Sequence, residues 1–313
     1  MKLKEESEMT EYLSSQNYIY SMDKSHKPAI TVKSGAQVEI ETFDCFQNQI
    51  QSEETTFNAI DWNQINPTTG PIFIEEAQPG DILKVKIDSI ELGEQGVMVV
   101  APNLGVMGHR IHDFTAKIIP IKDNKAIFNE KLALPLNPMI GVIGVAPEGE
   151  AVNNGTPGAH GGNMDTKLIT TGATVYFPVF QEGALFSLGD LHAAMGDGEV
   201  SVSGIEIPAK VKVTLEVIKG HSLNYPLLEN ADGIATLVSK ELLDEAANQS
   251  VEEMIDLLLP QTELSLEEMT MLMSAAGQSQ ISQIVDPLKT ARFFVPRFIL
   301  DAYNIELFSK RVG

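Results

Sequence analysis

Apolar and polar residues alternate in three stretches of this chain, and this period of two limits the possible folds more than any other feature. In residues 37–41, 83–88 and 210–217, valine, leucine or isoleucine occupies every second position and polar residues fill the positions between. Successive side chains of a strand point to opposite faces, so the pattern predicts antiparallel strands that are buried on one face. Turn residues such as Pro79-Gly80-Asp81 follow or precede such strands. We therefore expect a β-rich α+β fold with a jelly-roll-like β-sandwich body.

Helical signals appear only in the last third of the sequence. Ser250 with Glu253, and Ser265 with Glu268, have the spacing of a capping box, in which two side chains satisfy free backbone groups at a helix start. Pro260 would end the first helix and Gly277 the second. The sequence thus predicts a β-rich catalytic body over residues 1–220 and an α-rich portion over residues 221–313 that packs on it.

The composition excludes several classes of partner and site. The 22 basic and 43 acidic residues give a net charge of -21, which repels nucleic acid and anionic membranes. The apolar runs are too short to span a bilayer, and a cytoplasmic location follows as an expectation. A single cysteine, Cys45, excludes an internal disulfide and a thiolate-rich zinc site, so a bound metal would need oxygen and imidazole ligands.

Two stretches combine histidine with carboxylates. His160 and Asp165 flank Gly161-Gly162, and the glycines allow both side chains to converge, although an exposed turn is the alternative. If residues 184–192 form a strand, Asp190 and His192 lie at the end of an otherwise apolar face. A metal would satisfy both groups, and an Asp–His hydrogen bond would do so as well.

Three further acidic residues are candidates by position. Asp44 falls by parity at the end of the buried face that carries Val38 and Ile40, where it is either functional or the cap of a turn. Asp197 and Glu199 are either solvated turn residues or ligands of a hard cation. Cys45 points away from that face and is expected to be buried and inert.

Several motifs, taken together, resemble the acetamidase/formamidase family over nearly the whole chain. They are, in order, NPTTGPI at residues 66–72, AQPGD at 77–81, IGVAP at 143–147, HGGNMD at 160–165 and GDLHAAMGDGE at 189–199. The resemblance implies hydrolysis of formamide, acetamide or similar small amides, a divalent metal (zinc, with calcium as the alternative) and a homo-oligomer, dimeric or larger. It also implies roles for Asp165 in the first glycine-rich motif and for Glu148, with Glu150 competing for the role of Glu148.

The expected mechanism uses a metal ion whose candidate ligands come from both stretches. These candidates are Asp44, His160, Asp190, His192, Asp197 and Glu199. Glu148 is the candidate proton shuttle, and Lys167 or the glycine-loop amides would bind the oxyanion. Two alternatives remain: a Cys45-dependent amidase, and a binding protein that a metal stabilises without catalysis.

Overall fold

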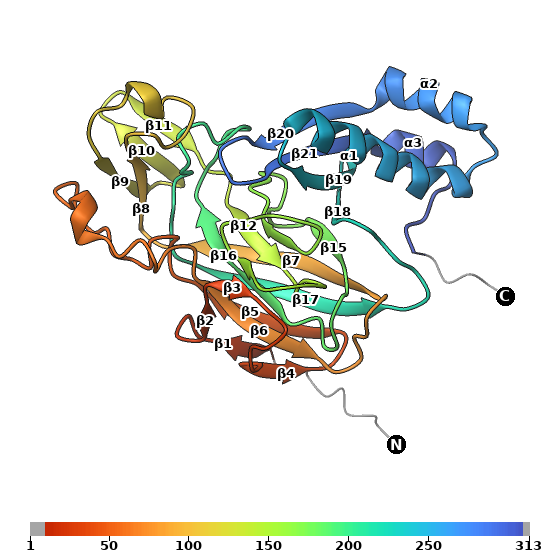
Figure 1. The fold of residues 1–313 in the computed structure, drawn as a ribbon, viewed down its shortest axis with the longest axis horizontal. Helices are drawn as coiled ribbons and strands as arrows, with labels where there is room; N and C mark the ends of the chain where they lie inside the picture. The colour runs from red at the N-terminus through yellow and green to blue at the C-terminus, as the bar shows by residue number, and fades with distance from the viewer. Residues whose placement is uncertain (1–9, 309–313) are drawn as a thin grey trace.

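A long antiparallel sheet runs through the whole molecule in the computed structural model, which describes residues 10–308 (Figure 1). Its nine strands extend from the N-terminal to the C-terminal part of the chain, and only β1 and β5 pair in parallel. The order is β1 (Glu11–Leu13), β5 (Ala36–Glu41), β17 (Ala209–Ile218), β7 (Ile82–Leu92), β15 (Thr174–Pro178), β18 (Leu227–Asn230), β19 (Gly233–Lys240), β21 (Lys289–Pro296) and β20 (Gln278–Gln283).

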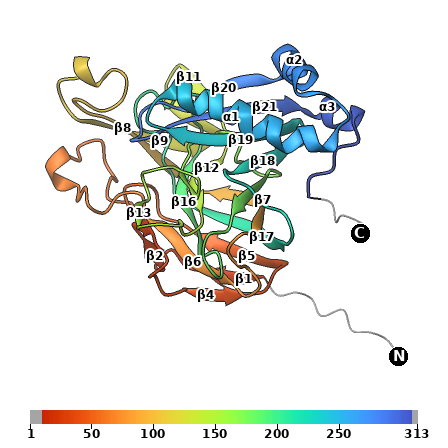
Figure 2. The ribbon, with the colours of Figure 1, turned by 45° about the vertical axis from the view of Figure 1, so that its right-hand side comes forward.

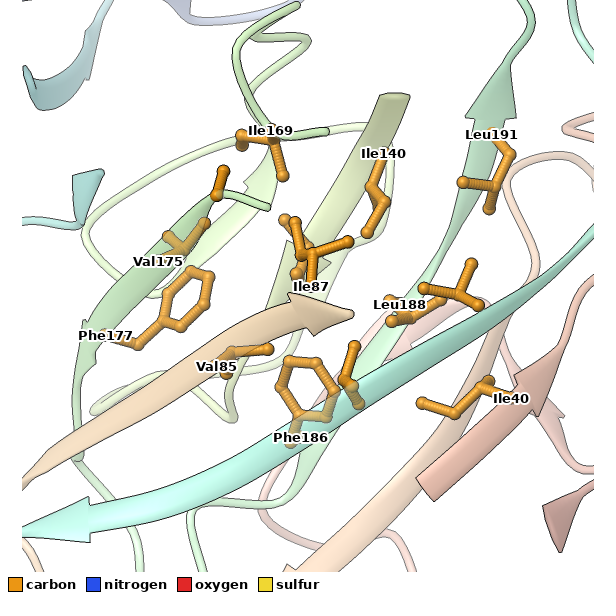
Figure 3. Close-up of a cluster of buried hydrophobic side chains, with 14 of the residues drawn as sticks. Ile40, Val85, Ile87, Ile140, Ile169, Val175, Phe177, Phe186, Leu188 and Leu191 are labelled. Carbon is orange, nitrogen blue, oxygen red and sulfur yellow. The ribbon is translucent and has the colours of Figure 1, made fainter. Parts of the chain in front are cut away.

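A second sheet packs on the N-terminal half of the first. It contains β14 (Gly161–Asn163), β12 (Met139–Gly144), β16 (Phe186–His192), β6 (Thr68–Ile74), β2 (Tyr18–Ile19) and β4 (Ile30–Val32). Figure 3 shows the layer between the sheets, where Val85 and Ile87 of β7 lie near Phe186 and Leu188 of β16. All four side chains are fully buried. This face-to-face packing of two sheets is a β-sandwich.

Two smaller sheets complete the β structure. One contains β8 (Gln95–Val100), β9 (Thr115–Lys122), β10 (Lys125–Asn129) and β11 (Leu132–Pro135), and the other pairs β3 (Ser21–Met22) with β13 (Val152–Asn153). The β8–β11 sheet extends beyond the sandwich at the upper left of Figure 1. Short 3₁₀ turns lie in the connections, at η1 (Phe57–Ala59), η2 (Gly108–Arg110) and η3 (Leu259–Gln261).

The helices cover the C-terminal end of the long sheet (Figure 2). They are α1 (Leu243–Leu258), α2 (Leu266–Ala276) and α3 (Arg297–Ala302). Met254 and Leu258 of α1, Met273 of α2 and Phe293 of β21 belong to one buried apolar cluster that is separate from the sandwich core. Apolar burial of this kind, rather than helix propensity, holds such helices in place.

The structure confirms a β-rich fold with helices at the C-terminal end, and it corrects one helix. The capping box of Ser265 and Glu268 begins α2 as predicted. The first helix begins at Leu243 instead of Ser250, which is buried in the middle of α1. The division at residue 220 stays a prediction, because β18, β19, β20 and β21 continue the sheet of the body. Within residues 10–308, no helix combines the length and apolar character needed to cross a membrane.

Candidate metal centre

A cluster of buried acidic side chains surrounds His192 at the end of β16. The Nε2 atom of His192 lies 3.1 Å from Glu206 Oε2, 3.6 Å from Asp190 Oδ1 and 3.9 Å from Asp165 Oδ1. None of these four residues is more than 5% exposed. The sandwich therefore brings an imidazole and three carboxylates together in a place that water barely reaches.

Neighbouring segments of the second sheet supply these groups. Asp190 and His192 lie on β16, and Asp165 follows β14, which pairs with β12 beside β16. Glu206 forms isolated bridges with both His192 and Val97 of β8. The centre thus lies where the second sheet meets the β8–β11 sheet.

Two sets of three side chains have the geometry of ligand groups among the described residues. Within each set, donor atoms lie within 4.8 Å of one another, and all members are buried. The sets are Asp165, His192 and Glu199, and Cys45, Asp190 and Glu206. Contacts of His192 with Asp190 and Glu206 connect the two sets.

Five polar atoms of the cluster make no hydrogen bond of suitable geometry, although His192 Nε2 and Glu206 Oε2 lie 3.1 Å apart. These atoms are both carboxylate oxygens of Asp165, both ring nitrogens of His192 and Oε2 of Glu206. Burying a charged carboxylate without a partner costs several kcal/mol, on the order of the penalty for an uncompensated ion. A divalent cation would satisfy these oxygen and imidazole donors together, so the residues present fit a metal ion.

Three residues of the cluster have a left-handed backbone that side chains other than glycine seldom adopt. The φ angles are 40° at Asp165, 56° at Asp190 and 45° at Glu199. Such conformations cost about 1–3 kcal/mol each and concentrate at functional sites. At Asp190 the unusual angle interrupts the regular alternation of β16, yet Asp190 and His192 still converge.

Two glycines provide the space for the cluster. A Cβ atom at Gly141 of β12 would lie 2.5 Å from Asp190 Oδ2 and would also collide with Asp165 Oδ1. A Cβ atom at Gly204 would lie 2.7 Å from the His192 ring. Any larger residue at these positions would push the candidate ligands apart, so the glycines shape the centre by the absence of a side chain.

Replacing Gly141 with alanine tests this shape. The backbone at Gly141 has no left-handed angle, so alanine can adopt its φ, but the new Cβ would also lie 2.9 Å from the Asp190 carbonyl oxygen; a circular-dichroism spectrum therefore checks that the variant is folded. The added methyl group should displace both carboxylates and weaken zinc binding by about 10- to 100-fold or more, as is typical when metal ligands lose their orientation. Zinc competition with a chelating dye measures the change. Gly149→Ala is the control, because a Cβ atom there meets nothing within 4 Å. Equal zinc affinity in the two variants would contradict this assignment.

The cluster also perturbs its own protonation. Burial raises the pKa of Glu206 to about 7. Burial also raises the pKa values of Asp165 and Glu199 well above their usual range, and the negative charges of neighbouring carboxylates add to this increase. Burial alone would lower the pKa of His192, but the charges of Glu206 and Asp190 raise it well above 6.5. Without a cation, the centre therefore retains protons at neutral pH.

The structure places Asp44 at the margin of the cluster. Its Oδ1 accepts hydrogen bonds from the backbone N–H groups of Phe46 at 2.9 Å and Asn48 at 2.7 Å, which is the turn-capping arrangement. Burial raises the pKa of Asp44 to about 6, and the charge of Asp190 contributes to the increase. Asp44 thus caps a turn and also adds negative charge beside Asp190.

The structure does not bring His160 or Glu148 to the cluster. His160 precedes Gly161, which pairs with Gly144 of β12, whereas His192 pairs with Met139 at the other end of that strand. Five residues of strand separate the two positions by about 16 Å. His160 and Glu148 instead line a separate cavity beside α1. Burial lowers the pKa of His160 to about 4, so this imidazole is neutral.

Asp197 and Lys167 lie beside the centre and bind each other. Lys167 Nζ is 2.8 Å from Asp197 Oδ2, and both side chains are about one-third exposed. Glu199, in contrast, is only 8% exposed, so it is not a solvated turn residue. The two acidic residues of this turn therefore have different environments.

Two further carboxylates of the centre have no counterpart among the sequence predictions. Glu206 stands between Ile205 and Ile207, and simple alternation would place it on a solvated face; it is buried because the segment is covered by β8 and β16. Asp286 comes from the C-terminal portion, where its Oδ2 accepts a hydrogen bond from Asn163 at 3.0 Å. Burial and the charge of Glu199 raise the pKa of Asp286.

A cavity of about 450 Å³ opens beside Glu199. Its walls are largely apolar and come from the β8–β11 sheet and from the turn after β16. The apolar lining includes Met98, Phe128, Leu134, Met195 and Ile205. Glu199 is the one residue of the two ligand sets that lines this cavity. Small molecules with an apolar part bind in such places, with a few polar groups to orient them.

Comparison with known proteins identifies the group to which this architecture belongs. A sequence profile described as the Acetamidase/Formamidase family matches residues 22–156 and 149–234, which include every residue of the two ligand sets. The chain belongs to the acetamidase/formamidase family.

Solved structures of acetamidase/formamidase proteins share the whole fold. The chain is 55% identical to a predicted acetamidase/formamidase from Thermoanaerobacter tengcongensis, with a TM-score of 0.94 over 96% of this chain and 99% of that one. It is 47% identical to an acetamidase from Bacillus halodurans, with a TM-score of 0.92 over 94% of this chain and 100% of that one. These similarities confirm the family resemblance of the sequence motifs.

Curated family members are more distant. The chain is 28% identical to the acetamidase of Mycolicibacterium smegmatis over 270 residues, which cover 64% of this chain and 66% of that protein. The chain spans less than two thirds of the length of the curated relatives that it matches.

Proposed function

We propose that this protein hydrolyses short aliphatic amides to a carboxylic acid and ammonia with a divalent metal ion. The observation that carries the proposal is the buried set of unpartnered carboxylate and imidazole atoms around His192, in a chain of the acetamidase/formamidase family. Relatives named acetamidase and formamidase support an amide substrate. Zinc is the proposed ion, since it accepts imidazole and carboxylate ligands readily, and calcium is the alternative.

The proposed ligands are Asp165, His192 and Glu199, with Asp190 and Glu206 next to them. A zinc ion bound there would lower the pKa of a coordinated water molecule towards about 7 and polarise the amide carbonyl. Glu206, whose Oε2 lies 3.1 Å from Nε2 of the proposed ligand His192, is the carboxylate that we propose for the transfer of a proton to the departing nitrogen. Glu206 thus takes the role that the sequence suggested for Glu148.

The apolar cavity suits the acyl part of the substrate. Glu199 is among the polar residues that line it, and Met195 and Phe128 are among the apolar residues of its walls. An amide oriented this way would place its carbonyl toward the ligand sets and its acyl chain toward the apolar walls. Acetyl and formyl groups are small for a cavity of about 450 Å³, so propionamide and butyramide belong in any substrate panel.

We also propose that the enzyme works as a homo-oligomer in the cytoplasm. The net charge of -21 argues against nucleic acid or an anionic membrane as partner. Val106, Met107 and Val200 expose 44–56% of their surface near the cavity, which is consistent with a subunit contact. Light scattering coupled to size exclusion determines the number of subunits.

Ammonia release from formamide and acetamide by metal-analysed protein tests the proposed function. We expect ammonia with a catalytic amount of zinc-loaded protein, at a rate proportional to protein concentration. The same assay separates catalysis from a non-catalytic binding protein that a metal stabilises. A metal-replete protein that releases no ammonia from any linear amide would contradict the proposal.

Cys45 provides a second candidate mechanism, in which its sulfur attacks the amide. The thiol is 7% exposed, and burial together with the charges of Glu206 and Asp190 raises its pKa, so the reactive thiolate is disfavoured. Cys45→Ala should therefore retain kcat within about tenfold, whereas loss of a true nucleophile costs about 10⁶-fold in a well-studied hydrolase. Metal analysis of the variant is the control, since Cys45 belongs to one ligand set. A loss of about 10⁴-fold or more at full metal content would favour the cysteine mechanism.

A further inference from the structure

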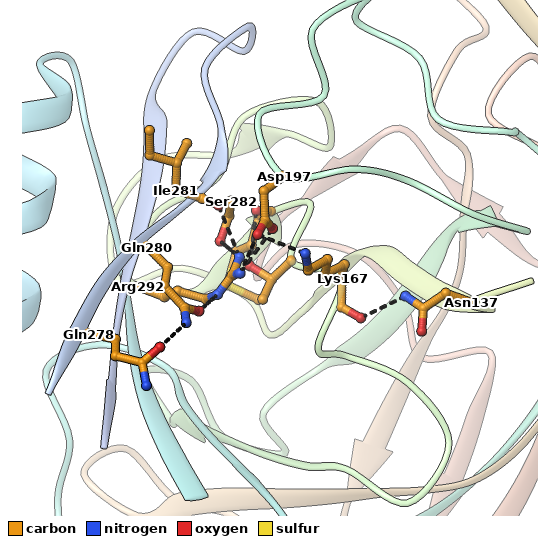
Figure 4. A network of polar contacts seen from close by, with 10 residues as sticks. Asn137, Lys167, Asp197, Gln278, Gln280, Ile281, Ser282 and Arg292 are labelled. Carbon is orange, nitrogen blue, oxygen red and sulfur yellow. Dashed lines mark hydrogen bonds and ion pairs between the residues drawn. The ribbon is translucent and has the colours of Figure 1, made fainter. Parts of the chain in front are cut away.

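Arg292 of β21 is a fully buried cation next to the metal centre, although it belongs to the C-terminal portion. It is 1% exposed, and all three of its guanidinium nitrogens donate hydrogen bonds (Figure 4). Nε donates to Gln280 Oε1 at 2.7 Å, and Nη1 donates to the Ile281 carbonyl and to Ser282 Oγ, both at 3.1 Å. Nη2 donates to both carboxylate oxygens of Asp197 at 2.9 Å. The guanidinium group is thereby held in one orientation.

One side of this network holds the turn that carries Glu199. Asp197 lies two residues before Glu199 and is bound from the other side by Lys167. The next residue, Gly198, donates its N–H to the Ser282 carbonyl at 2.7 Å and accepts from Ile284 N–H at 3.2 Å. Two backbone hydrogen bonds thus attach Gly198 to the end of β20, and the ion pair with Arg292 attaches Asp197 to β21, directly before the left-handed backbone of Glu199.

The other side of the network reaches the loop that carries Asp165. Ser282 Oγ, which accepts from Arg292, also accepts a hydrogen bond from Thr166 Oγ1 at 2.8 Å. Thr166 is completely buried and directly follows Asp165. A single guanidinium group therefore connects both segments that supply carboxylates to the ligand set of Asp165, His192 and Glu199.

We infer that Arg292 is a positioning residue that holds Asp165 and Glu199 at the separation that a shared metal ion requires. This inference rests on the proposed metal-dependent function. The packing of β20 against β21 does not require a charged side chain at position 292. A well-packed apolar residue usually stabilises a buried position as much as a buried ion pair does, or more. The positive charge of Arg292 is used to bind Asp197. Residues that orient metal ligands without binding the metal themselves typically change metal affinity by about 10- to 100-fold.

Zinc affinity of two variants, measured by competition with a chelating dye, tests the inference. Asp197→Asn removes the negative charge from the partly exposed side, while the Asn Oδ1 can still accept a hydrogen bond from Arg292 Nη2; a circular-dichroism spectrum checks that the variant is folded. Arg292→Lys keeps a positive charge but cannot contact Gln280, Ser282 and Asp197 together. We expect each variant to bind zinc about 10- to 100-fold more weakly. The double variant should have the same zinc affinity as the single variant that binds zinc less tightly, because both substitutions break the same contact between Arg292 and Asp197.

Arg297→Lys is the matched control for a purely structural effect. Arg297 also lies in the C-terminal portion, but its Nη2 donates hydrogen bonds to Glu229 Oε1 at 2.9 Å and to the Asn230 carbonyl at 2.6 Å instead of to the turn that carries Glu199. This variant should lose some thermal stability and keep wild-type zinc affinity. If Arg292→Lys does not fold, Asp197→Asn decides alone.

Wild-type zinc affinity in folded Asp197→Asn would overturn the inference. A zinc affinity that falls equally in Arg297→Lys would overturn it as well, because the effect would then be general. The outcome is independent of the amidase assay: a wild-type protein that binds zinc but releases no ammonia contradicts the proposed function and leaves the positioning role of Arg292 in place.

Discussion

Replacing His192 with alanine is expected to lower kcat/KM for acetamide by more than about 100-fold. Loss of a residue that only orients a metal ligand lowers activity by about 10- to 100-fold, and loss of a ligand should lower it further. His192 provides the one imidazole of the two ligand sets and contacts Asp165, Asp190 and Glu206. Its removal deletes the imidazole ligand and the side chain that contacts all three carboxylates. Steady-state ammonia release, with zinc content determined in the same samples, measures the loss.

His160→Gln is the matched control for this experiment. His160 is also a buried histidine, 4% exposed, but it lines a different cavity beside α1. We expect its kcat/KM to remain within about tenfold of the wild type, well below the loss at a metal ligand. If His160→Gln and His192→Ala lose activity equally, His160 acts in the reaction and the location of the site has to be revised.

Removing the metal with a chelator is expected to abolish amide hydrolysis and to destabilise the protein increasingly as pH rises. In the metal-free protein, burial raises the pKa of Asp44 to about 6 and of Glu206 to about 7, above the values of about 4 for unfolded chains. The folded state therefore retains protons that the unfolded state releases. Below about pH 4 both states are protonated and these groups cost no stability; the loss develops as pH rises through the folded pKa values.

The metal-bound protein should respond in the opposite way, because binding requires deprotonated carboxylates and a neutral imidazole. The increase in Tm on zinc addition should thus be small near pH 5 and larger near pH 8. At a free zinc concentration about 1,000 times Kd, ligand binding stabilises by about 4 kcal/mol, or roughly 5–10 °C for a domain of this size. Calorimetry of chelated and reloaded protein across this pH range measures the difference. A zinc-induced Tm increase that is constant or declines with pH, or full activity after complete chelation, would contradict a buried metal site.

The fold was predictable where burial is one-sided. The alternation in residues 83–88 and 210–217 corresponds to β7 and β17, whose apolar side chains face the core and whose lysines do not. The strand β19 gave no such signal, because residues 233–239 are all buried and show no alternation. Ser250 was misleading as a helix start, since its hydroxyl bonds to the Ala247 carbonyl within α1, an alternative that capping patterns do not exclude.

The candidate site was predictable only where its residues are close in sequence. Asp190 and His192 lie two residues apart, and parity along one strand suggested their convergence. The separation of His160 from His192 depends on the register of β12 between β14 and β16, which no local pattern specifies. Asp286 joins the centre through the pairing of β20 with β21 and the contact with Asn163, 123 residues away. Contacts over such distances follow from topology and not from local sequence.

The continuity of the nine-stranded sheet has a consequence for dissecting this protein. A fragment that ended at residue 220 would lose β18, and β15 would become the open edge of a sheet whose N–H and C=O groups face solvent. Val175 and Phe177, which are fully buried, lie on that strand. Long apolar edges pair readily with other chains and promote aggregation. The C-terminal portion therefore covers the edge of β15, and we expect a fragment of residues 1–220 to aggregate.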